Sequence, residues 1–419
     1  MLTLESIADA LRQQPRLVIA DDFEIAVQRC RGQSVRYQNG EPCLQASNER
    51  FWVSLRVLHR KRGGIATVFN PAPEDLKNLV DQAFDAAQRS SLDPWFRFPI
   101  WKNLPEVKVP APELRPERSH AALFGDAATL FDETYEALDT QTFLRRKTEK
   151  QTRRSSSQKL SARLAFFQAD RRFAFSQDRL GPAADLPLWI ARMKEAAENR
   201  GQQVRLSQLP KRWILTPAVA STWLRALAPW FYARTVQEGR SPLAGRESFS
   251  KAISLVDDGR HPYAAYGGEF DLEGSPLQKT PLIVRGERRD LLHDVYSATR
   301  DNRLSTANFH RDVADPHPST RASALYVEAG QHDLGALVAE MGHGLILDHL
   351  DSWDVPAGTD KVQFTASGRL VEGGRVAGAV SSVPAECGLA DLLDYTVAAG
   401  SDLEFFRGVG SPSLLVEVQ

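Results

Sequence analysis

Cysteine and long apolar runs are both scarce in this sequence. Its 419 residues include three cysteines, Cys30, Cys43 and Cys387, and an odd, sparse set argues against a disulfide scaffold. No apolar run approaches the roughly 20 residues that a helix needs to span a bilayer, and the first residues lack the apolar core of a signal peptide. These absences predict a soluble, cytoplasmic protein with no membrane partner.

A net charge of one sign is also missing. The chain has 52 basic and 53 acidic residues, a formal net charge of -1, so no overall field attracts nucleic acid or anionic lipid. Eight Lys or Arg residues fall between Arg145 and Arg163, and such a run can bind nucleic acid. They alternate with Thr, Gln and Ser, and Ser155-Ser156-Ser157 stands where a hairpin would turn. This pattern favours a solvated hairpin face over a nucleic-acid site.

The common nucleotide and hydrolase motifs do not occur. The sequence contains no G-x-x-x-x-G-K-[ST], G-x-G-x-x-G, G-x-S-x-G, C-x-x-C or H-E-x-x-H. Residue types that bind metals do gather in ALVAEMGHGLILDHL, at Glu340, His343 and His349. Glu340 and His343 can share a helix face, but His349 lies beyond Gly342, the natural helix stop. A helix end followed by a strand is therefore favoured over a zinc site, which would need further ligands.

Two acidic pairs are candidates for a polar site. Asp257 and Asp258 are adjacent at the end of an apolar strand, so their side chains point to opposite faces and cannot act as a pair. The glycine that follows them favours a turn. Asp271 and Glu273, in EFDLEGSP, are spaced by two and would share one strand face. They are the better candidate, although a turn role competes with it.

The order of elements predicts an α+β fold with two domains. Residues 1–205 are expected to form an antiparallel sheet with flanking helices. Residues 206–419 are expected to form a β-rich domain that contains a helix after Thr216, with Pro217 at its first position.

Local signals place the turns and helices within these domains. Hairpin turns are predicted at Arg31-Gly32, Asn39-Gly40 and Arg62-Gly63-Gly64. Thr3 is the expected N-cap of a helix over residues 2–14, and an apolar stripe of Leu76, Leu79, Val80, Ala83 and Phe84 predicts a helix over 74–91. Further helices are predicted over residues 120–138, 333–341 and 387–399.

A long run in the second half is distinctive: TVQEGRSPLAGRESFSKAISLVDDGRHPYAAYGGEFDLEGSPLQKTPLIVRGERRDLLHDVYSA, followed by LSTAN. It is accompanied by RGGIATVFNPAPEDLKNLVDQAFDAAQRSSLDP in the first half and by ALYVEAGQHDLGALVAEMGHGLIL, AGSDLEFF and GSPSLLVEV near the end. In order and spacing these segments resemble the TldD/PmbA family, also called TldD/TldE or modulator of DNA gyrase. The resemblance covers nearly the whole chain.

The resemblance implies a fold and a function. Members are two-domain α+β proteins, and a TldD-type chain pairs with a TldE-type chain to form a metallopeptidase that matures ribosomally made peptides and degrades small unfolded proteins. The TldD-type subunit binds zinc through an H-E-x-x-x-H motif on a second-domain helix and a cysteine near the C-terminus. Two imidazoles hold the ion, and the glutamate is the general base for a metal-bound water.

This chain departs from the family's zinc motif. Aligned by its place before QEGRS, the motif falls on Arg225, Ala226 and Trp230, which neither bind zinc nor take a proton. The C-terminal cysteine is missing, and Cys387 lies upstream. The resemblance therefore implies a metal-free TldE/PmbA-type subunit with no catalytic residue and no cofactor of its own. Zinc is expected in a TldD-type partner, with a homodimer as the alternative assembly.

The former metal position is filled by large side chains, and the sequence leaves open whether they form a new pocket or a plug. They are Trp213, Trp223, Arg225 and Trp230.

Motif positions of the family also predict residues that line a cleft for an unfolded peptide, which would add as an extended strand. Packing within loops is an equal alternative for each of them. These substrate-binding candidates are Gln237, Glu238, Gly239, Arg240, Ser241, Asp271, Glu273, Gly274, Ser305 and Thr306.

Three function classes follow from the sequence. The first is the non-catalytic subunit of a TldD/TldE-like zinc metallopeptidase that processes or degrades small or unfolded peptides. The second is an interaction protein that modulates DNA gyrase. The basic run at 145–163 is the only feature of the sequence that supports this hypothesis directly. The third is a stand-alone hydrolase with a site around Glu340, His343 and His349.

Overall fold

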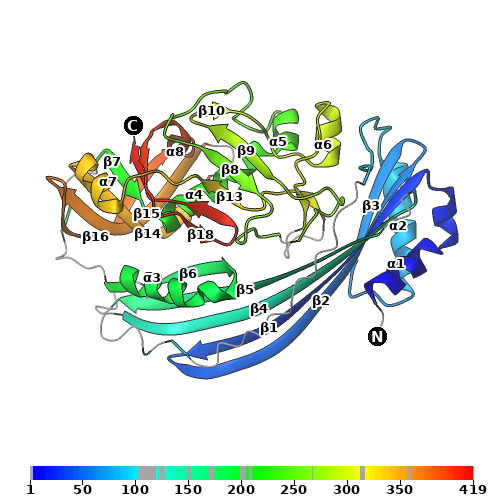
Figure 1. Cartoon of the computed structure of the whole chain (residues 1–419), viewed down its shortest axis with the longest axis horizontal. Coiled ribbons are helices and arrows are strands. Elements are labelled where there is room, and N and C mark those ends of the chain that lie inside the picture. The colour runs from blue at the N-terminus through cyan, green and yellow to red at the C-terminus, as the bar shows by residue number, and fades with distance from the viewer. Residues whose placement is uncertain are drawn as a thin grey trace.

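The computed structural model describes residues 3–101, 119–120, 122, 128–148, 152–168, 174–198, 204–206, 210–266, 268–311, 317–356 and 360–418. These residues form a mixed α+β protein with three six-stranded sheets and one two-stranded sheet. The predicted α+β class is confirmed. Figure 1 shows one sheet of long, curved strands lying beneath the rest of the chain.

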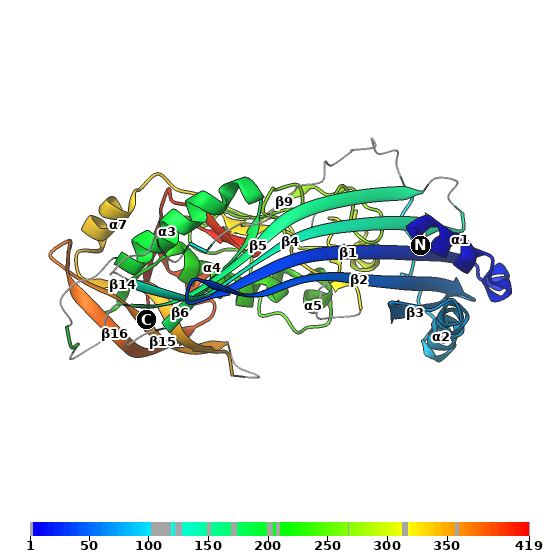
Figure 2. The ribbon, with the colours of Figure 1, turned by 90° about the horizontal axis from the view of Figure 1, so that it is seen from below.

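The first sheet has the strand order β3-β2-β1-β4-β5-β6, and every neighbouring pair is antiparallel. Figure 2 shows β2, β1, β4 and β5 side by side along nearly its whole length. The strands of this first sheet are β1 (Asp22–Gln38), β2 (Glu41–His59), β3 (Arg62–Phe69), β4 (Ala128–Arg146), β5 (Arg153–Gln168) and β6 (Ala174–Gly181).

Helices cover the two ends of the first sheet (Figure 1). At one end lie α1 (Leu4–Arg12), the 3-10 turn η1 (Pro15–Ile19) and α2 (Asp75–Arg89), which bury their apolar stripes against β1, β2 and β3. At the other end, η4 (Ala183–Asp185) leads into α3 (Leu186–Glu198), which packs on β4 and β5.

The Thr3 cap predicted for the first helix and the apolar stripe predicted for the second are confirmed. The Thr3 hydroxyl caps α1 by accepting a hydrogen bond from the Ser6 amide at 3.0 Å. In α2, the predicted stripe is buried, consisting of Leu76, Leu79, Val80, Ala83 and Phe84.

The turns of the first sheet were predicted in part. Asn39-Gly40 joins β1 to β2 with positive φ at both residues, as a tight hairpin requires. The turn predicted at Arg31-Gly32 is wrong, because both residues lie inside β1 and pair with β2 and β4. The turn predicted at 62–64 is also wrong. Arg60-Lys61 turns instead, with φ of 51° and 59°, and residues 62–64 belong to β3.

Two further predictions in this region are wrong. The helix predicted over 120–138 is in fact β4 from residue 128 onward, while residues 121 and 123–127 lie outside the described residues. Ser155, Ser156 and Ser157 are not a turn but part of β5, opposite β4. Pairing on both sides of β4, with β1 and with β5, overrides the helical spacing of its side chains.

The second half of the chain, residues 210–418, contains the other sheets. One has the order β10-β9-β8-β13-β19-β18, another β16-β15-β14-β7-β20-β17, and β11 pairs with β12. These strands are β7 (Arg212–Leu215), β8 (Leu255–Asp258), β9 (Lys279–Val284), β10 (Glu287–Arg288), β11 (Phe309–His310), β12 (Ser319–Thr320), β13 (Leu325–Val327), β14 (Gly344–Asp354), β15 (Lys361–Glu372), β16 (Arg375–Gly388), β17 (Thr396–Ala399), β18 (Glu404–Phe406), β19 (Val409–Ser411) and β20 (Leu414–Glu417).

Helix α4 (Pro217–Leu227) occupies the core of this second half. It packs against β13, β18 and β19 of one large sheet and against β7 and β14 of the other. Its predicted start is confirmed, since Thr216 is the N-cap residue and Pro217 the first helical residue. The 3-10 turn η5 (Ala228–Phe231), which contains Pro229, follows directly and ends the helix.

The remaining helices are short. They are α5 (Ala233–Gln237), α6 (Val295–Arg300), α7 (Leu334–Met341) and α8 (Asp391–Asp394). The prediction of α7 is confirmed, with Asp333 as its cap and Gly342 at φ 68° as its stop. The helix predicted over 387–399 is wrong except for α8, because β16 and β17 occupy its two ends.

The predicted domain boundary near residue 205 stays a prediction. It falls between α3 and β7. No helix in the described part of the chain is both long and apolar enough to cross a membrane.

Candidate functional site

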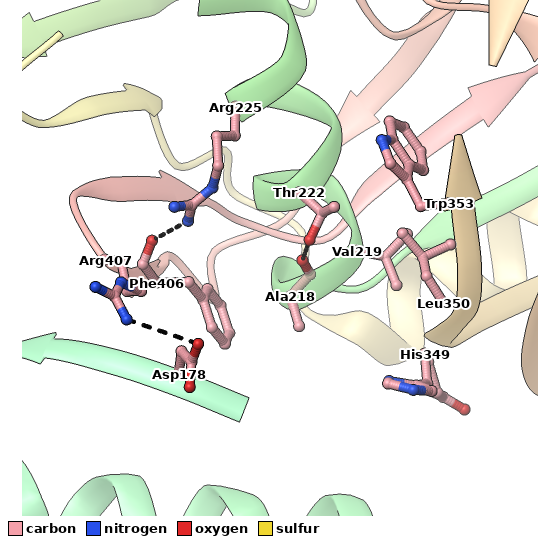
Figure 3. Close-up of a pocket in the computed structure, with 11 residues that line it drawn as sticks. Asp178, Ala218, Val219, Thr222, Arg225, His349, Leu350, Trp353, Phe406 and Arg407 are labelled. Carbon is pink, nitrogen blue, oxygen red and sulfur yellow. Dashed lines mark hydrogen bonds and ion pairs between the residues drawn. The ribbon is translucent and has the colours of Figure 1, made fainter. Parts of the chain in front are cut away.

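A pocket of about 350 Å³ lies beside α4. Four elements meet there: β6 of the first sheet, α4, β14, and the turn after β18 (Figure 3). We call it the α4 pocket. Its lining residues are Asp178, Ala218, Val219, Thr222, Arg225, Asp348, His349, Leu350, Trp353, Phe406 and Arg407.

Charged groups in the α4 pocket are neutralised by protein neighbours. Arg407 Nη1 lies 3.7 Å from Asp178 Oδ2 (Figure 3). Asp348 accepts two hydrogen bonds from Arg369, at 2.7 and 2.8 Å. Every carboxylate that lines the pocket is thus paired with a guanidinium.

Arg225 extends from α4 into this pocket. Its Nη2 donates to the Phe406 carbonyl oxygen at 2.6 Å (Figure 3). Displacement of water around the guanidinium, and then the positive charge of Arg407, lower the pKa of Arg225. Burial also lowers the pKa of His349, which favours a neutral imidazole. The pocket therefore presents a cation from α4 on one side and, on the β14 side, an uncharged ring and the Trp353 side chain (Figure 3).

The other residues at the former metal position form a plug rather than a pocket. Ala226 and Trp230 are partly buried and pack against the core around α4. Trp213 donates to the Pro210 carbonyl at 2.9 Å, and Trp223 donates to the Leu389 carbonyl at 3.0 Å. Of the residues that align with the zinc motif, Arg225 alone lines the α4 pocket.

Glu340, His343 and His349 do not form one site. His349 lines the α4 pocket, whereas Glu340 and His343 are exposed at the end of α7 and do not line it. The part of the chain that the structure describes holds no group of three or more His, Cys, Asp or Glu side chains placed to share a metal ion. The stand-alone hydrolase hypothesis thus has no assembled site among these residues.

The first group of predicted substrate-binding residues, 237–241, is the end of α5 and the turn after it. The Gln237 amide donates to the Ser297 carbonyl of α6 at 2.9 Å. Glu238 and Arg240 are exposed and pair with each other, and Gly239 has φ 68° with open space around it. Ser241 is buried, and its hydroxyl donates to the Trp230 carbonyl at 2.7 Å.

Asp271 and Glu273 are buried in a turn, so the prediction of a shared strand face is wrong. Asp271 accepts hydrogen bonds from the amides of Glu273, Ser275 and Phe309. Such backbone capping curls the chain back on itself, which a strand does not allow. Burial raises the pKa of Asp271 well above its usual value, and the charge of Glu273 adds to the shift.

Glu273 joins the second half to the first sheet. Its Oε1 accepts from Arg56 Nη1 of β2 at 2.6 Å, and its Oε2 accepts from the Val295 amide of α6 at 2.7 Å. Arg56 also lies 3.6 Å from Glu24 of β1. Burial raises the pKa of Glu273 although Arg56 opposes the shift, and burial raises that of Glu24 to about 7.

Gly274 is required by close packing. Its φ is 77°, and an added Cβ would lie 2.5 Å from Trp101 Nε1, the atom that donates to the Glu273 carbonyl at 2.9 Å. A side chain at this position would collide with the hydrogen bond that holds the turn.

The last two candidates belong to another buried network. Thr306 accepts a hydrogen bond from the His293 amide at 2.6 Å and lies 2.7 Å from Asn308 Oδ1, while Asn308 donates to Asp257 Oδ2 at 2.7 Å. Ser305 donates to the His293 carbonyl at 3.1 Å. Asp257 is thus buried and hydrogen-bonded, and burial raises its pKa to about 6.

Gln237 and Glu273, which come from different groups of candidates, both contact α6. None of the ten lines the α4 pocket. Conversely, sequence reasoning missed Asp178, Trp353 and Arg407, which reach the pocket from three different elements. No local pattern marks them, because their meeting depends on how the first sheet lies against the second half.

Comparison with known sequences identifies the family. Residues 212–419 match the PmbA/TldA metallopeptidase C-terminal domain, and residues 23–87 match PmbA/TldA metallopeptidase domain 1. The chain belongs to the PmbA/TldD family.

Curated relatives of the PmbA/TldD chain match over shorter stretches. It is 39% identical over 88 residues to an uncharacterised protein of Methanocaldococcus jannaschii, 20% of this chain and 21% of that one. It is 22% identical over 169 residues to a metalloprotease TldD homolog of Buchnera aphidicola, 40% of this chain and 35% of the relative. The matches thus span about a fifth to a third of the relatives' length.

Solved structures share the PmbA/TldD fold over the full chain. A candidate modulator of a DNA gyrase from Thermotoga maritima superposes with a TM-score of 0.83 at 18% identity, covering 99% of each chain. TldE from Thermococcus kodakarensis superposes with a TM-score of 0.79 at 19% identity, covering 98% of each chain. These likenesses establish the fold.

The residues predicted to stand at the family's zinc position do not fit a zinc ion. Arg225 carries a positive charge, Ala226 has no donor atom, and Trp230 packs against the core with an indole N–H that only donates. The nearby carboxylates, Asp178 and Asp348, already pair with arginines. No catalytic step through a metal follows from this site.

Proposed function

We propose that this chain is the non-catalytic, TldE/PmbA-type subunit of a TldD/TldE-like zinc metallopeptidase that processes or degrades small or unfolded peptides. The observation that carries the proposal is the presence of Arg225, Ala226 and Trp230 at the positions that align with the zinc motif. They lie on α4 and on the η5 turn that follows it, within the part of the chain that matches the family's C-terminal domain. In this proposal, zinc and the general base belong to a TldD-type partner, and this chain supplies shape and contact surface.

The outer edge of β2 supports a role in assembly. Residues 52–59 pair with β3, but residues 41–50 pair with β1 alone among the described residues and are exposed along their length. A long edge strand without a neighbour is a place where another chain can add. A TldD-type partner is the occupant that we propose, with a second copy of this chain as the alternative.

The candidate lining residues divide by exposure. Glu238 and Arg240 are exposed and can contact a bound peptide directly. Asp271, Glu273 and Thr306 are buried and hydrogen-bonded, so their part in the proposal is to hold the shape of the neighbouring loops.

The gyrase hypothesis has no comparable support in the basic run. Four of its arginines face carboxylates at 2.7 to 3.0 Å. Salt links of this kind leave little free positive charge for phosphate groups. The paired residues are Arg145 with Asp9, Arg146 with Asp22, Arg154 with Glu5, and Arg163 with Asp178.

The decisive experiment measures zinc content and peptidase activity for this chain alone, for a TldD-type partner alone, and for the two co-expressed. We expect no zinc and no activity in this chain alone, and activity that requires the pair. One equivalent of zinc in the isolated chain, or peptide hydrolysis by it, would contradict the proposal.

A matched pair of variants then tests the lining. Arg240→Ala should reduce the activity of the pair without changing the stability of this chain. Arg289→Ala is the control, because Arg289 is also exposed and also pairs with a glutamate two residues earlier. Equal activities of the two variants would remove Arg240 from the lining.

A further inference from the structure

A second cavity, also of about 350 Å³, lies between the first sheet and the loops of the second half. Its floor consists of side chains from β1, β2, β4, β5 and β6. Its roof consists of Ala265, Tyr266, Phe270, Leu272, His310, Arg311 and Arg407. We call it the sheet cavity. Its size is within the range of small-molecule sites in proteins.

The lining of the sheet cavity is unevenly charged. Four cationic side chains face it, and the one carboxylate among its lining residues is Glu136. Burial holds the pKa of His310 near 3, so that ring is uncharged. The four cationic residues are Arg50, Lys159, Arg311 and Arg407.

Lys159 is the unusual member of this set. It lies in the middle of β5, opposite Leu138 of β4, and its Nζ is buried without a hydrogen-bond partner in the part of the chain that the structure describes. Loss of hydration is the cause that lowers its pKa to about 7. Burying an ammonium group without a counter-charge costs several kcal/mol, and no contact made by Nζ offsets that cost.

Apolar and aromatic surface accompanies the charge. Trp52 from β2 and Phe270 from the roof line the cavity, and Arg311 lies over the Trp52 ring at 5.5 Å. Arg50, two residues before Trp52 on the same strand, is exposed. A ligand here would meet a planar apolar wall next to positive charge.

We propose that the sheet cavity binds a small organic anion, whose carboxylate or phosphate oxygens pair with the ammonium group of Lys159 and whose apolar body lies along the apolar part of the lining. Charge-assisted hydrogen bonds to such oxygens are the interactions that a buried ammonium lacks here. The site is distinct from the α4 pocket and does not depend on the proposed role in a peptidase.

Anion binding at this site depends on pH. Binding requires the ammonium form, so the affinity for a benzoate-like anion should be about tenfold weaker at pH 8 than at pH 6, as expected for a group that titrates near pH 7. The titratable and charged groups that face the cavity alongside Lys159 are Cys30, Arg50, Glu136, Tyr266, His310, Arg311 and Arg407.

The test uses the full chain and three probes of similar shape, namely benzoate, phenyl phosphate and neutral benzamide, in calorimetric titrations at pH 6 and pH 8. We expect saturable binding of at least one anion and weaker binding of benzamide. Preference for benzoate would assign a carboxylate ligand, and preference for phenyl phosphate a phosphate ligand. Binding of neither anion, or equal binding of benzamide, would overturn the proposal.

Variants locate the binding. Lys159→Met should weaken anion binding by about tenfold or more, because it removes the charge and keeps the length of the side chain. Lys77→Met is the control, since Lys77 is exposed on α2, and it should bind as the natural chain does. Arg50→Met, at an exposed position, should weaken binding by a few fold and provides a second test that does not disturb the interior. Unchanged binding in both Lys159→Met and Arg50→Met would overturn the assignment.

Discussion

The α4 pocket and the sheet cavity have similar volumes and share Arg407 as a lining residue, but their charged side chains differ in how they are paired. In the α4 pocket, Asp178 and Asp348 each face an arginine, and Arg225 donates to a backbone carbonyl. In the sheet cavity, Lys159 has no hydrogen-bond acceptor among the described residues.

The Arg56 cluster shows what this fold does with a buried charge that serves structure. Arg56 lies between Glu273 at 2.6 Å and Glu24 at 3.6 Å, and all three are buried. It ties β2 to the second half across the same junction that forms the sheet cavity. The charges of this cluster are thus paired, whereas Lys159 has no acceptor among the described residues, and that difference is the better indication of a ligand.

Removing Arg56 should produce the largest effect. Arg56→Met leaves Glu24 and Glu273 buried without their cation and should lower the free energy of unfolding by about 3–5 kcal/mol in urea titrations at pH 7.5. The loss of stability should be smaller at pH 5, because Glu24 and Glu273 are then protonated and no longer need a cation. Arg36→Met, which breaks the exposed pair with Asp132 in the same sheet, should cause no resolvable change. A loss below about 1 kcal/mol for Arg56→Met would show that pairing is not what holds the junction.

The turn that positions Glu273 gives the next largest effect. Gly274→Ala should destabilise the chain by about 2–3 kcal/mol, since it combines positive φ with a collision against Trp101. Gly239→Ala is a matched control, with φ 68° and no atom within 4 Å of the added Cβ, and should cost only about 1 kcal/mol. Thermal unfolding of both variants separates the cost of backbone strain, which both share, from the cost of the collision with Trp101. Equal losses of stability in the two variants would argue against the collision.

Lys159→Met should change stability in the opposite direction. The pKa of Lys159 is lowered from 10.5 to about 7 in the folded chain, so between these values the unfolded chain binds more protons and stability rises with pH. The variant should therefore be about 1–2 kcal/mol more stable at pH 6, and the difference should shrink as pH rises from 7 towards 10.5. Urea titrations across this range measure it. A variant that is less stable at pH 6 would mean that Lys159 is paired in solution.

The smallest change is expected from rebuilding the zinc motif. Arg225→His, Ala226→Glu and Trp230→His introduced together should leave the zinc content well below one equivalent after dialysis. Helix α4 ends at Leu227 and Pro229 follows, so the second imidazole would stand on η5 rather than on the same helix as the first. Metal analysis of the folded variant, checked by circular dichroism, decides the point. Stoichiometric zinc would mean that the backbone of the α4 pocket still suits a metal.

Local sequence signals predicted four helices correctly and failed at two, over 120–138 and 387–399, where strands form instead. Thr3, the α2 stripe, Pro217 and Asp333 act within a few residues of themselves, so the sequence alone reveals α1, α2, α4 and α7. Strand β4 was predicted as a helix, because its state depends on β1 and β5, which lie far away in sequence.

The candidate site shows the same limit. Family motifs led to Arg225, Asp271 and Glu273, but not to the partners that give them their properties. Arg56 is 217 positions from Glu273 in the sequence. Asp178 reaches the α4 pocket from the first sheet, whereas α4 packs against the sheets of the second half. Burial and ion pairing arise from the packing of the first sheet against the second half, which periodicity and spacing do not encode.

The position of β20 has a consequence for protein synthesis. Strand β20 lies between β7 and β17 in its sheet, and β7 is the first strand of the second half to be made. The first sheet can pair as soon as residue 181 has left the ribosome. In the sheet that contains β7, the place between β7 and the edge strand β17 stays empty until residues 414–417 have followed. A ribosome that stalls a few codons before them would hold a chain with a finished first sheet and an unpaired strand edge on β7.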